Sequence, residues 1–396
     1  MAGALEGIRI VDCTAMITGP FATQILGDQG AEVIKIEPPG FGDIMRLLGT
    51  ARGGMSTFFA LFNRSKRSIV VNLREERGQQ LARDLAATAD VFIQNFRPGV
   101  IDRLGLGEAE LRAEHPELVY ASISAYGPTG PDAGKPAFDH ILQGRTGFAY
   151  AQADPQEEDA KPEYVRQAIC DKVTALNVSQ AITAALFARE RTGQGQHLQL
   201  SMLDAALSFV WPDSMTNQVI LDDDFERKPA ISATYRTTDF PDGYLSIAAV
   251  TDDQFRGVCN AMGFPELADD PRFKTLVDRS RNMIELLDTL RAHSSDIPAA
   301  EAMARLEAED VPCGPVHKPD DVPNDPQIIA SGSFEEVDHP VLGRIRQPRP
   351  PARFEATPSS AERPAPALGQ DTDAILAELG LPEAERAELR AKGIVA

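Results

Sequence analysis

Short apolar runs alternate with helical patterns along the first half of the chain. β-branched and other apolar residues predict buried strands at residues 8–12, 32–37, 68–73, 90–96 and 118–124. Residues 21–30 and 75–89, which lie between such runs, have the spacing of helices. This alternation predicts an α/β fold with a mostly parallel sheet, helices on both faces, and ligands at the carboxyl ends of the strands.

A longer helical pattern follows Asp171. Apolar residues recur at helical spacing after it, and Gly193 follows the charged last turn. Asp is a preferred N-cap residue, so Asp171 has an ordinary interpretation as a helix cap. It also has an interpretation as a working carboxylate, because a helix N-terminus keeps a carboxylate ionised and stabilises a developing oxyanion. This stretch alone leaves both interpretations open.

The second half of the chain has a different pattern. Residues 193–211 predict a strand and then a helix, and the polar, irregular residues 212–242 indicate a linker. Residues 243–313 predict a small α+β domain. A second linker rich in Pro and Asp covers residues 314–335. The tail contains a β-like stretch and a final pair of helices.

Composition excludes several classes of protein. The chain has 396 residues, 43% of them apolar, and a formal charge of −20, which argues against nucleic acid or an anionic membrane as partner. The four cysteines lie far apart, which fits neither a zinc site nor a disulfide framework, so we expect no metal site and reduced thiols in a cytoplasmic protein. We find no export signal and no apolar run long enough to cross a membrane.

A dinucleotide-binding fold is the first candidate for this pattern. Glu37 ends the second predicted strand, where a ribose-binding acid is expected. The loop after the first strand, "TAMITGPFATQ", has one glycine and no G-x-G-x-x-G motif, which argues against nicotinamide or flavin binding. The basic cluster "NRSKR" at residues 63–67 has two interpretations: it faces a nucleotide, or it solvates a turn.

Sequence blocks spread along nearly the whole chain carry a family resemblance. They include "GPFATQILGDQGAEVIKIEPPGFGD", "FNRSKRSIVVNL", "ADVFIQNFRPGVIDRLGLG", "PAFDHILQGRTG", "ARERTGQGQHLQLSMLDAAL" and "PALGQDTDAILAELG". In this order they resemble the class III coenzyme A (CoA) transferases, the family of formyl-CoA transferase, carnitine CoA-transferase and the related α-methylacyl-CoA racemases. The resemblance implies that Asp171 is a nucleophile that forms an aspartyl-CoA thioester while CoA moves between carboxylic acids.

The resemblance also assigns contacts with CoA. It implies that Asp139 and Met202 are auxiliary residues near the acyl and pantetheine groups, and that no cofactor is tightly bound. For each arginine the alternative is an ordinary surface charge, and for Met202 it is a core position. The implied CoA contacts are Ile17, Thr18, Val71, Asn72, Leu73, Arg74, Asn95, Phe96, Arg97 and Arg103.

Two other functions share this family's features. A 2-methylacyl-CoA racemase needs an acid/base pair, but Phe138 occupies the position of the racemase histidine, and Phe carries no proton. We do not transfer that role to His140, whose ordinary interpretation is a capping or surface residue. A non-catalytic acyl-CoA-binding protein would have no use for Asp171. The apolar Ile17 argues against an acid as small as oxalate, and the sequence does not choose among larger acids.

The resemblance implies an architecture as well. Residues 1–211 and 336–396 would form a Rossmann-like, CoA-binding large domain, and residues 243–313 the small domain. Two chains would interlock as a homodimer, with the linkers at residues 212–242 and 314–335 passing between the domains. The monomer would then depend on its partner for much of its apolar burial.

Overall fold

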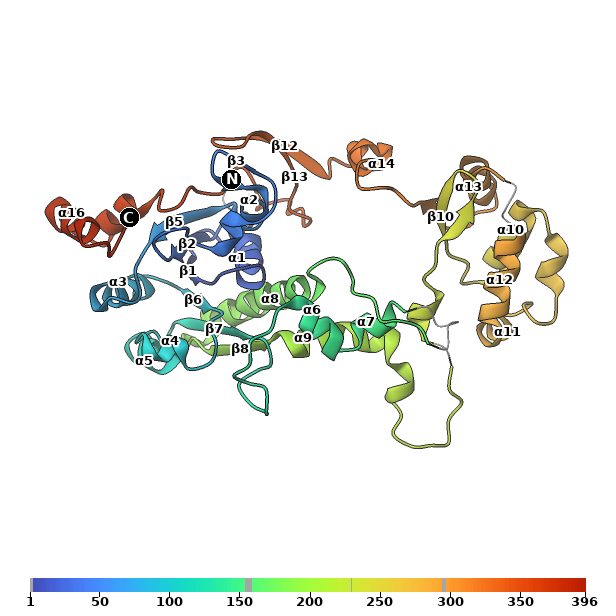
Figure 1. The fold of residues 1–396 in the computed structure, drawn as a ribbon, viewed down its shortest axis with the longest axis horizontal. Coiled ribbons are helices and arrows are strands. Elements are labelled where there is room, and N and C mark those ends of the chain that lie inside the picture. Colours follow the sequence, from blue (N-terminus) through green and yellow to red (C-terminus); the bar gives the residue numbers. More distant parts are fainter. Residues whose placement is uncertain (1–2, 154–158, 229, 294–296) are drawn as a thin grey trace. The chain divides into compact units, whose positions relative to one another are not determined.

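The computed structural model describes residues 3–153, 159–228, 230–293 and 297–396. The chain divides into two compact units. The larger comprises Met1–Phe148, Tyr164–Phe209 and Ile329–Ala396, and the smaller comprises Ala149–Glu163 and Val210–Ile328. The tail returns to the N-terminal half of the chain, where α15 packs against β5 (Figure 1).

A six-stranded sheet forms the centre of the larger unit, and all its neighbouring strands are parallel. In spatial order the strands are β5 (Lys66–Val70), β2 (Glu32–Glu37), β1 (Arg9–Cys13), β6 (Val91–Gln94), β7 (Val119–Ser124) and β8 (His197–Ser201). The predicted α/β fold is therefore confirmed. The order reverses between β1 and β6, and ligands of open α/β sheets generally bind at the carboxyl ends of the strands beside such a reversal.

One predicted strand is displaced. The pattern placed it at residues 68–73, but β5 starts at Lys66 and ends at Val70. The Val71 N–H still donates to the Glu37 carbonyl of β2, but Val71 also forms an antiparallel bridge with Val395, and the Asn72 N–H donates to the Ile394 carbonyl. The tail of the chain thus takes over the hydrogen bonds that would have continued the strand.

Helices cover both faces of the sheet. On one face α1 (Thr18–Asp28) packs against α8 (Ile169–Thr192), which ends at Gly193 in the left-handed conformation. The other helices up to the end of the sheet are α2 (Thr57–Asn63), α3 (Glu76–Ala86), α4 (Val100–Arg103), α5 (Glu108–Glu114), α6 (Asp139–Arg145), α7 (Phe148–Ala151) and α9 (Met202–Ser214). The larger unit also has two hairpins, β3 (Ala51–Arg52) with β4 (Met55–Ser56) and β12 (Phe334–His339) with β13 (Gly343–Pro348). The last helices of the chain are α14 (Pro326–Ala330), α15 (Thr372–Glu378) and α16 (Glu383–Ala391).

The two faces of the sheet have different interiors, one apolar and one that contains charged residues. Val11 and Ile34 belong to an apolar core that also contains residues of α3, α15 and α16. Because successive strand side chains point to opposite faces, the neighbouring Asp12 and Lys35 point the other way. They are nevertheless buried. The face that carries α1 therefore holds charged groups in its interior.

The smaller unit has its own core. Its antiparallel sheet has the order β11 (Cys313–Pro315), β10 (Gly243–Ile247), β9 (Thr238–Phe240). Its helices are α10 (Asp252–Met262), α11 (Leu276–Arg281), α12 (Met283–His293) and α13 (Ala299–Ala308). Phe255, Phe273 and Leu306 are buried in this core. Thr251 and Gln254 form a capping box that starts α10.

Candidate active site

Asp171 lies in the first turn of α8. The helix begins at Ile169 and Ala168 occupies the N-cap position, so the interpretation of Asp171 as the N-cap is wrong. Its side chain instead reaches another helix, because Asp171 Oδ1 accepts a hydrogen bond from the Thr18 hydroxyl. The carboxylate is therefore held by a residue far away in the sequence.

Thr18 is the first residue of α1 and is 2% exposed. It offers both its hydroxyl and its backbone N–H to the Asp171 carboxylate. The hydroxyl oxygen also lies 3.8 Å from Met202 Sδ. Asp171 thus faces the N-terminus of an 11-residue helix, whose free N–H groups and dipole favour negative charge.

Asp139 holds the backbone of the same turn. Asp139 Oδ2 accepts the Asp171 N–H at 3.0 Å, and Oδ1 accepts Gln143 Nε2 at 2.6 Å. A residue of α6 therefore supplies the cap that α8 lacks in its own sequence. The N–H groups of a first helical turn have no partner within their helix, so this bond also satisfies an otherwise unpaired donor.

The surroundings of Asp171 shift its titration. Burial raises the pKa of Asp171 to about 6; the hydrogen bonds from Thr18 oppose this rise and the charge of Asp139 adds to it. Burial also raises the pKa of the adjacent Cys170 thiol to about 12. At neutral pH the site therefore presents a carboxylate next to a protonated thiol.

The loop between β1 and α1 lies at the reversal of strand order. The Asn95 side chain, just after β6, donates to the Ala15 carbonyl at 2.7 Å and accepts the Ala15 N–H at 3.0 Å. Asn95 thereby ties the loop to the neighbouring strand. Ile17 is 7% exposed and packs with Met45 and Phe59 in an apolar cluster. The side chain that argued against oxalate is thus a core side chain.

The other sequence-predicted CoA contacts follow β5 and β6. Val71 is buried, Asn72, Leu73 and Phe96 are partly buried, and Arg74, Arg97 and Arg103 are exposed. Phe96 and Arg97 line a cavity of about 320 Å³ that also borders β7 and β8. Thr18, Asp139 and Met202 therefore gather at Asp171, while the remaining predicted contacts are spread along the adjoining strand ends.

Three residues that bear on the alternatives are also placed. Met202 is buried at the start of α9, so it is both a core residue and a neighbour of Thr18. Phe138 is exposed just before α6. His140 is exposed on α6, where its ring meets the edge of Tyr164.

The basic cluster at residues 63–67 neither faces solvent nor stands free for a nucleotide. Arg64 pairs with Asp28 and Lys66 with Asp12, both in the interior. Arg67 pairs with Glu32 and Glu378. Both interpretations of this cluster are wrong, because each cation has a carboxylate partner that local sequence does not reveal.

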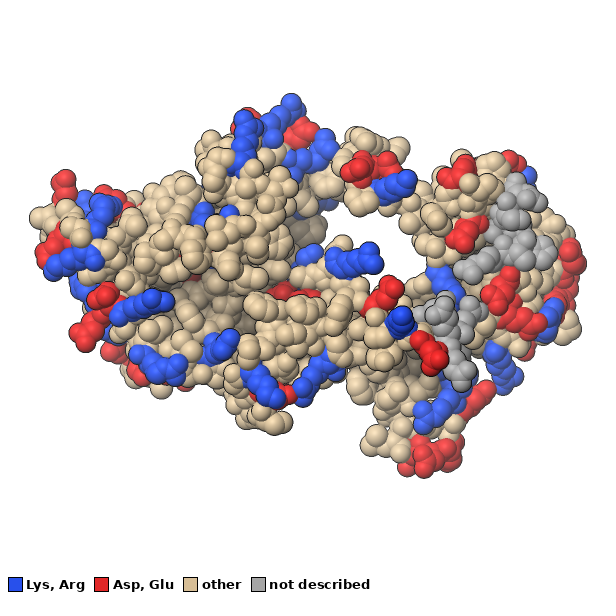
Figure 2. All heavy atoms as spheres, in the orientation of Figure 1, with Lys and Arg blue, Asp and Glu red and all other residues tan. Residues whose placement is uncertain are grey.

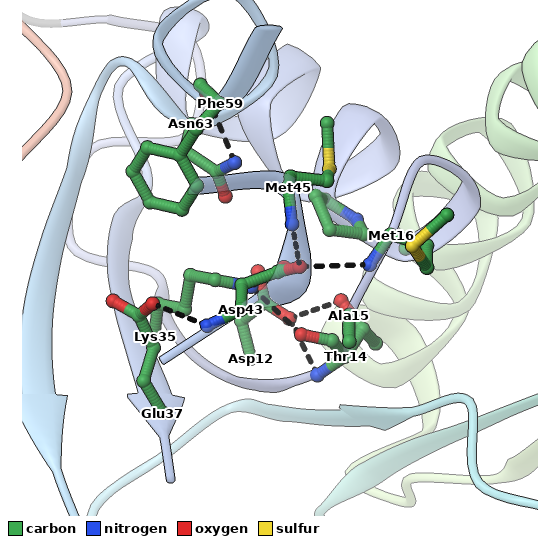
Figure 3. A network of polar contacts seen from close by, with 12 residues as sticks. Asp12, Thr14, Ala15, Met16, Lys35, Glu37, Asp43, Met45, Phe59 and Asn63 are labelled. Carbon is green, nitrogen blue, oxygen red and sulfur yellow. Dashed lines mark hydrogen bonds and ion pairs between the residues drawn. The ribbon is translucent and has the colours of Figure 1, made fainter. Parts of the chain in front are cut away.

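A buried network of charges beneath the loop was missed at the sequence level. Lys35 pairs with Asp43 at 3.0 Å, and Arg46 pairs with Glu37 at 2.7 Å through two hydrogen bonds. Figure 3 shows Asp43 close to the backbone of Met16 and Met45, and Asp43 Oδ1 accepts hydrogen bonds from the N–H groups of both residues. The available signal was charged residues at alternate positions inside otherwise apolar strands.

The charged surface, possible metal ligands and possible membrane-spanning helices bear on what the chain can bind. On the face shown in Figure 2, Lys and Arg are interspersed with Asp and Glu. Within the described residues, no group of three or more His, Cys, Asp and Glu side chains is arranged to hold a metal ion. None of the described helices combines the length and apolarity that crossing a membrane requires.

Comparison with known proteins identifies the family. The model of CoA-transferase family III matches residues 5–372. The chain belongs to CoA-transferase family III. Succinyl-CoA:glutarate CoA-transferase of Mus musculus is 35% identical over 95% of this chain and 86% of its own length. Acetyl-CoA:oxalate CoA-transferase of Acetobacter aceti is 36% identical over 97% of each chain.

The fold of this class III CoA-transferase has solved counterparts. The crystal structure of a CAIB/BAIF family protein from Brucella suis superposes with a TM-score of 0.81 and is 33% identical. The match covers 96% of this chain and 100% of that one. The resemblance found in the sequence, the α/β fold and the enzyme class are therefore all confirmed.

Proposed function

We propose that this enzyme moves CoA from an acyl-CoA to a free carboxylic acid through a covalent intermediate on Asp171. The observation that carries the proposal is the geometry of Asp171. Its carboxylate is partly buried, faces the N-terminus of α1 and accepts hydrogen bonds from Thr18. A desolvated carboxylate of this kind is a stronger nucleophile than one in water.

The reaction proceeds by balanced exchanges of acyl groups. The Asp171 carboxylate attacks the thioester carbonyl, a mixed anhydride forms, and CoA leaves as a thiolate. The thiolate then attacks the Asp171 carbonyl of the anhydride, giving an aspartyl-CoA thioester and releasing the first carboxylic acid. An incoming carboxylate reverses both steps and leaves as the new acyl-CoA. Since each bond made resembles the bond broken, the cycle needs no external energy source.

The residues around Asp171 support this chemistry. As the nucleophile attacks, negative charge moves from its carboxylate to the thioester oxygen, and N–H donors at the start of α1 are suited to stabilise it. Asp139 fixes the backbone of Asp171 and so restricts the direction of attack. The Met202 side chain and the neighbouring apolar cluster exclude water, which would hydrolyse an anhydride.

CoA itself would lie along the ends of β5 and β6. The exposed Arg74, Arg97 and Arg103 suit its phosphates, and Phe96 offers an aromatic surface beside the cavity that it lines. The names of the two relatives above pair succinyl-CoA with glutarate and acetyl-CoA with oxalate, and both free acids in these names are dicarboxylic. We therefore propose dicarboxylic acids as the first acids to examine.

The active enzyme is proposed to be an interlocked homodimer with the large domain, small domain and linkers bounded as in the sequence analysis. Leu176 and Phe187, both on α8, are more than half exposed. They lie about three turns apart and so share a face of the helix. The opposite face, with Val178 and Ile182, is buried in the unit. A helix that is apolar on both faces is normally covered on both.

A trapping experiment tests the covalent route. The enzyme is incubated with succinyl-CoA, acetyl-CoA, and branched or aromatic acyl-CoAs in the presence of hydroxylamine, and its peptides are analysed by mass spectrometry. Hydroxylamine converts an aspartyl-CoA thioester to a hydroxamate, which we expect on Asp171. The modification should be absent from Asp171→Ala, which still binds CoA.

Two other outcomes would favour the alternatives. Exchange of the α-proton with heavy water, with Asp171 unmodified, would identify a racemase. Binding of CoA with neither modification nor proton exchange across the panel would identify an acyl-CoA-binding protein. Modification of Asp171 together with formation of a new acyl-CoA from an added dicarboxylic acid would establish the transferase route.

A further inference from the structure

The peptide groups of the loop before α1 are held by side chains from other elements. Lys35 Nζ donates to the Thr14 carbonyl at 2.7 Å, and Asp43 Oδ1 accepts the Met16 N–H at 3.3 Å. Between them, Asn95 makes its two hydrogen bonds with Ala15. Figure 3 shows Lys35 and Asp43 on one side of this loop, with Thr14, Ala15 and Met16 to the right of Asp43. Three consecutive residues thus have backbone partners outside the loop.

Such holding is needed because the loop is strained. Met16 has φ of 65°, in the left-handed region that side-chain-bearing residues rarely adopt. Conformations of this kind persist only where the surroundings impose them. Two residues after Met16 comes Thr18, whose hydroxyl and N–H meet Asp171. The strained residue therefore determines where α1 begins relative to the carboxylate.

The supporting pair is itself locked in place. The side chains of Lys35 and Asp43 are 0% and 1% exposed and lie 3.0 Å apart. The Asp43 N–H donates to Glu37 Oε2, and Glu37 is paired with Arg46. Neighbouring acids raise the pKa of Lys35 although its burial opposes this, so its ammonium stays charged. A rigid, fully paired group of charges thus lies directly below the loop.

We propose that Lys35 and Asp43 are positioning residues for the nucleophile: they hold the loop so that Thr18 meets Asp171 in the reactive geometry. This inference rests on the proposed role of Asp171 as the acylated residue. Neither Lys35 nor Asp43 contacts Asp171, so their effect passes through the loop and Thr18.

The groups that face Asp171 determine how the effect is measured. Asp139 on α6 is charged, Cys170 is a protonated thiol, and Thr18 on α1 and Met202 on α9 are uncharged. Of these, Thr18 alone lowers the pKa of Asp171. A loop that no longer holds Thr18 would leave Asp171 with a higher pKa and a slower attack.

The first test is Asp43→Asn in the full-length protein. The rate of Asp171 labelling is followed in single turnovers with hydroxylamine, using succinyl-CoA or whichever panel member labels the wild type fastest. We expect labelling at saturating acyl-CoA to slow about ten-fold, the size of effect expected when one hydrogen bond to a charged group is lost. We also expect the acid limb of the pH–rate profile to move to higher pH, with little change in the acyl-CoA concentration for half-maximal rate.

Asp28→Asn is a matched control. Asp28 is also buried and also paired with a cation, Arg64, at 2.8 Å, but it lies at the opposite end of α1 from Thr18. It should lose stability as Asp43→Asn does while keeping the wild-type acid limb and labelling rate. If the two variants behave alike in labelling and pH dependence, Asp43 is merely structural and the proposal is wrong.

A double variant covers the case in which Asp43→Asn fails to fold. Lys35→Met with Asp43→Leu removes both buried charges together, and apolar replacements of a buried pair often keep or restore stability. The double variant loses the backbone hydrogen bonds of both side chains but leaves neither charge of the pair buried without its partner, so it should fold with reduced resistance to denaturant and label slowly. Wild-type labelling rates in this variant would overturn the inference. Absence of labelling in the wild type itself would instead refute the proposed role of Asp171.

Discussion

At the scale of single residues, Asp171 carries its charge where burial opposes it. In the proposed reaction the attacking form is the carboxylate, so the rate of labelling should fall as pH drops below the pKa of about 6. The charge of Asp139 contributes to that raised pKa. In Asp139→Asn the amide oxygen can still accept the Asp171 N–H, but the charge is gone. We expect the acid limb of the pH–rate profile for labelling to move to lower pH in this variant. An acid limb that stays in place or moves to higher pH would contradict the effect of the Asp139 charge on Asp171.

The Thr18 hydroxyl has the opposite effect on the same carboxylate. Thr18→Val keeps the shape of the side chain but removes its donor, so the pKa of Asp171 should rise further and its labelling should slow about ten-fold. Thr18→Ser restores the hydroxyl and should recover most of the rate. The pair is compared by single-turnover labelling across pH. Equal rates in the valine and serine variants would show that only the backbone N–H of Thr18 matters.

The resemblance named several residues that the structure brings together around Asp171, but it did not reveal the contacts that hold them there. Asp171, Asp139 and Met202 were implied by resemblance alone, since a lone Asp at the start of a helix is more often a cap. The cap interpretation failed because Asp139 of another helix supplies the cap, and such a partner leaves no local pattern. Lys35 and Asp43 were missed for a similar reason: burial of a charge is decided by its partner, which lies elsewhere in the chain.

At the scale of elements, a glycine in α3 tests how closely that helix must approach the proposed CoA segment. A Cβ on Gly78 would lie 2.1 Å from the Asn72 carbonyl oxygen. Gly78→Ala should therefore push α3 away from residues 71–74, cost about 1–3 kcal/mol of stability, and raise the acyl-CoA concentration for half-maximal rate. Denaturant unfolding and labelling kinetics measure the two effects.

The same substitution in α6 provides the control for Gly78→Ala. A Cβ on Gly144, which is exposed, would lie no closer than 3.8 Å to another group, the Tyr164 hydroxyl. Since alanine favours helices by about 1 kcal/mol over glycine, Gly144→Ala should be neutral or stabilising. A stabilised Gly78→Ala would show that α3 tolerates displacement from Asn72.

Elements with a strong internal period were predictable, and those whose ends depend on distant contacts were not. The buried face of α3, with Leu81 and Leu85, follows from the spacing of its own apolar residues. The end of β5 does not, because Val71 pairs with Val395 from the other end of the chain. A strand's boundary is set by its hydrogen-bonding partner as much as by its own residues.

At the scale of the whole molecule, the exposed apolar face of α8 bears on the assembly. Sedimentation equilibrium should give twice the chain mass of 42.9 kDa if the proposed homodimer forms. Phe187→Asp places a charge on that face and should shift the equilibrium toward monomer. Ala384→Asp, at an exposed position of α16, is a control with the same new side chain and the same change in charge. A wild-type monomer, or a dimer unaffected by Phe187→Asp, would place the contact elsewhere or exclude it.

The buried network has equal numbers of positive and negative charges, and this predicts how the reaction rate depends on ionic strength. Three buried carboxylates are each paired with a buried cation: Asp12 with Lys66, Glu37 with Arg46, and Asp43 with Lys35. Dissolved ions do not enter the interior, so salt screens these pairs very little. Salt will change how a chain of net charge −20 captures an anionic thioester. The chemical step at saturation should nevertheless stay within about two-fold between ~0.02 and ~0.5 M salt, because the charges that hold the nucleophile's support are never exposed to screening.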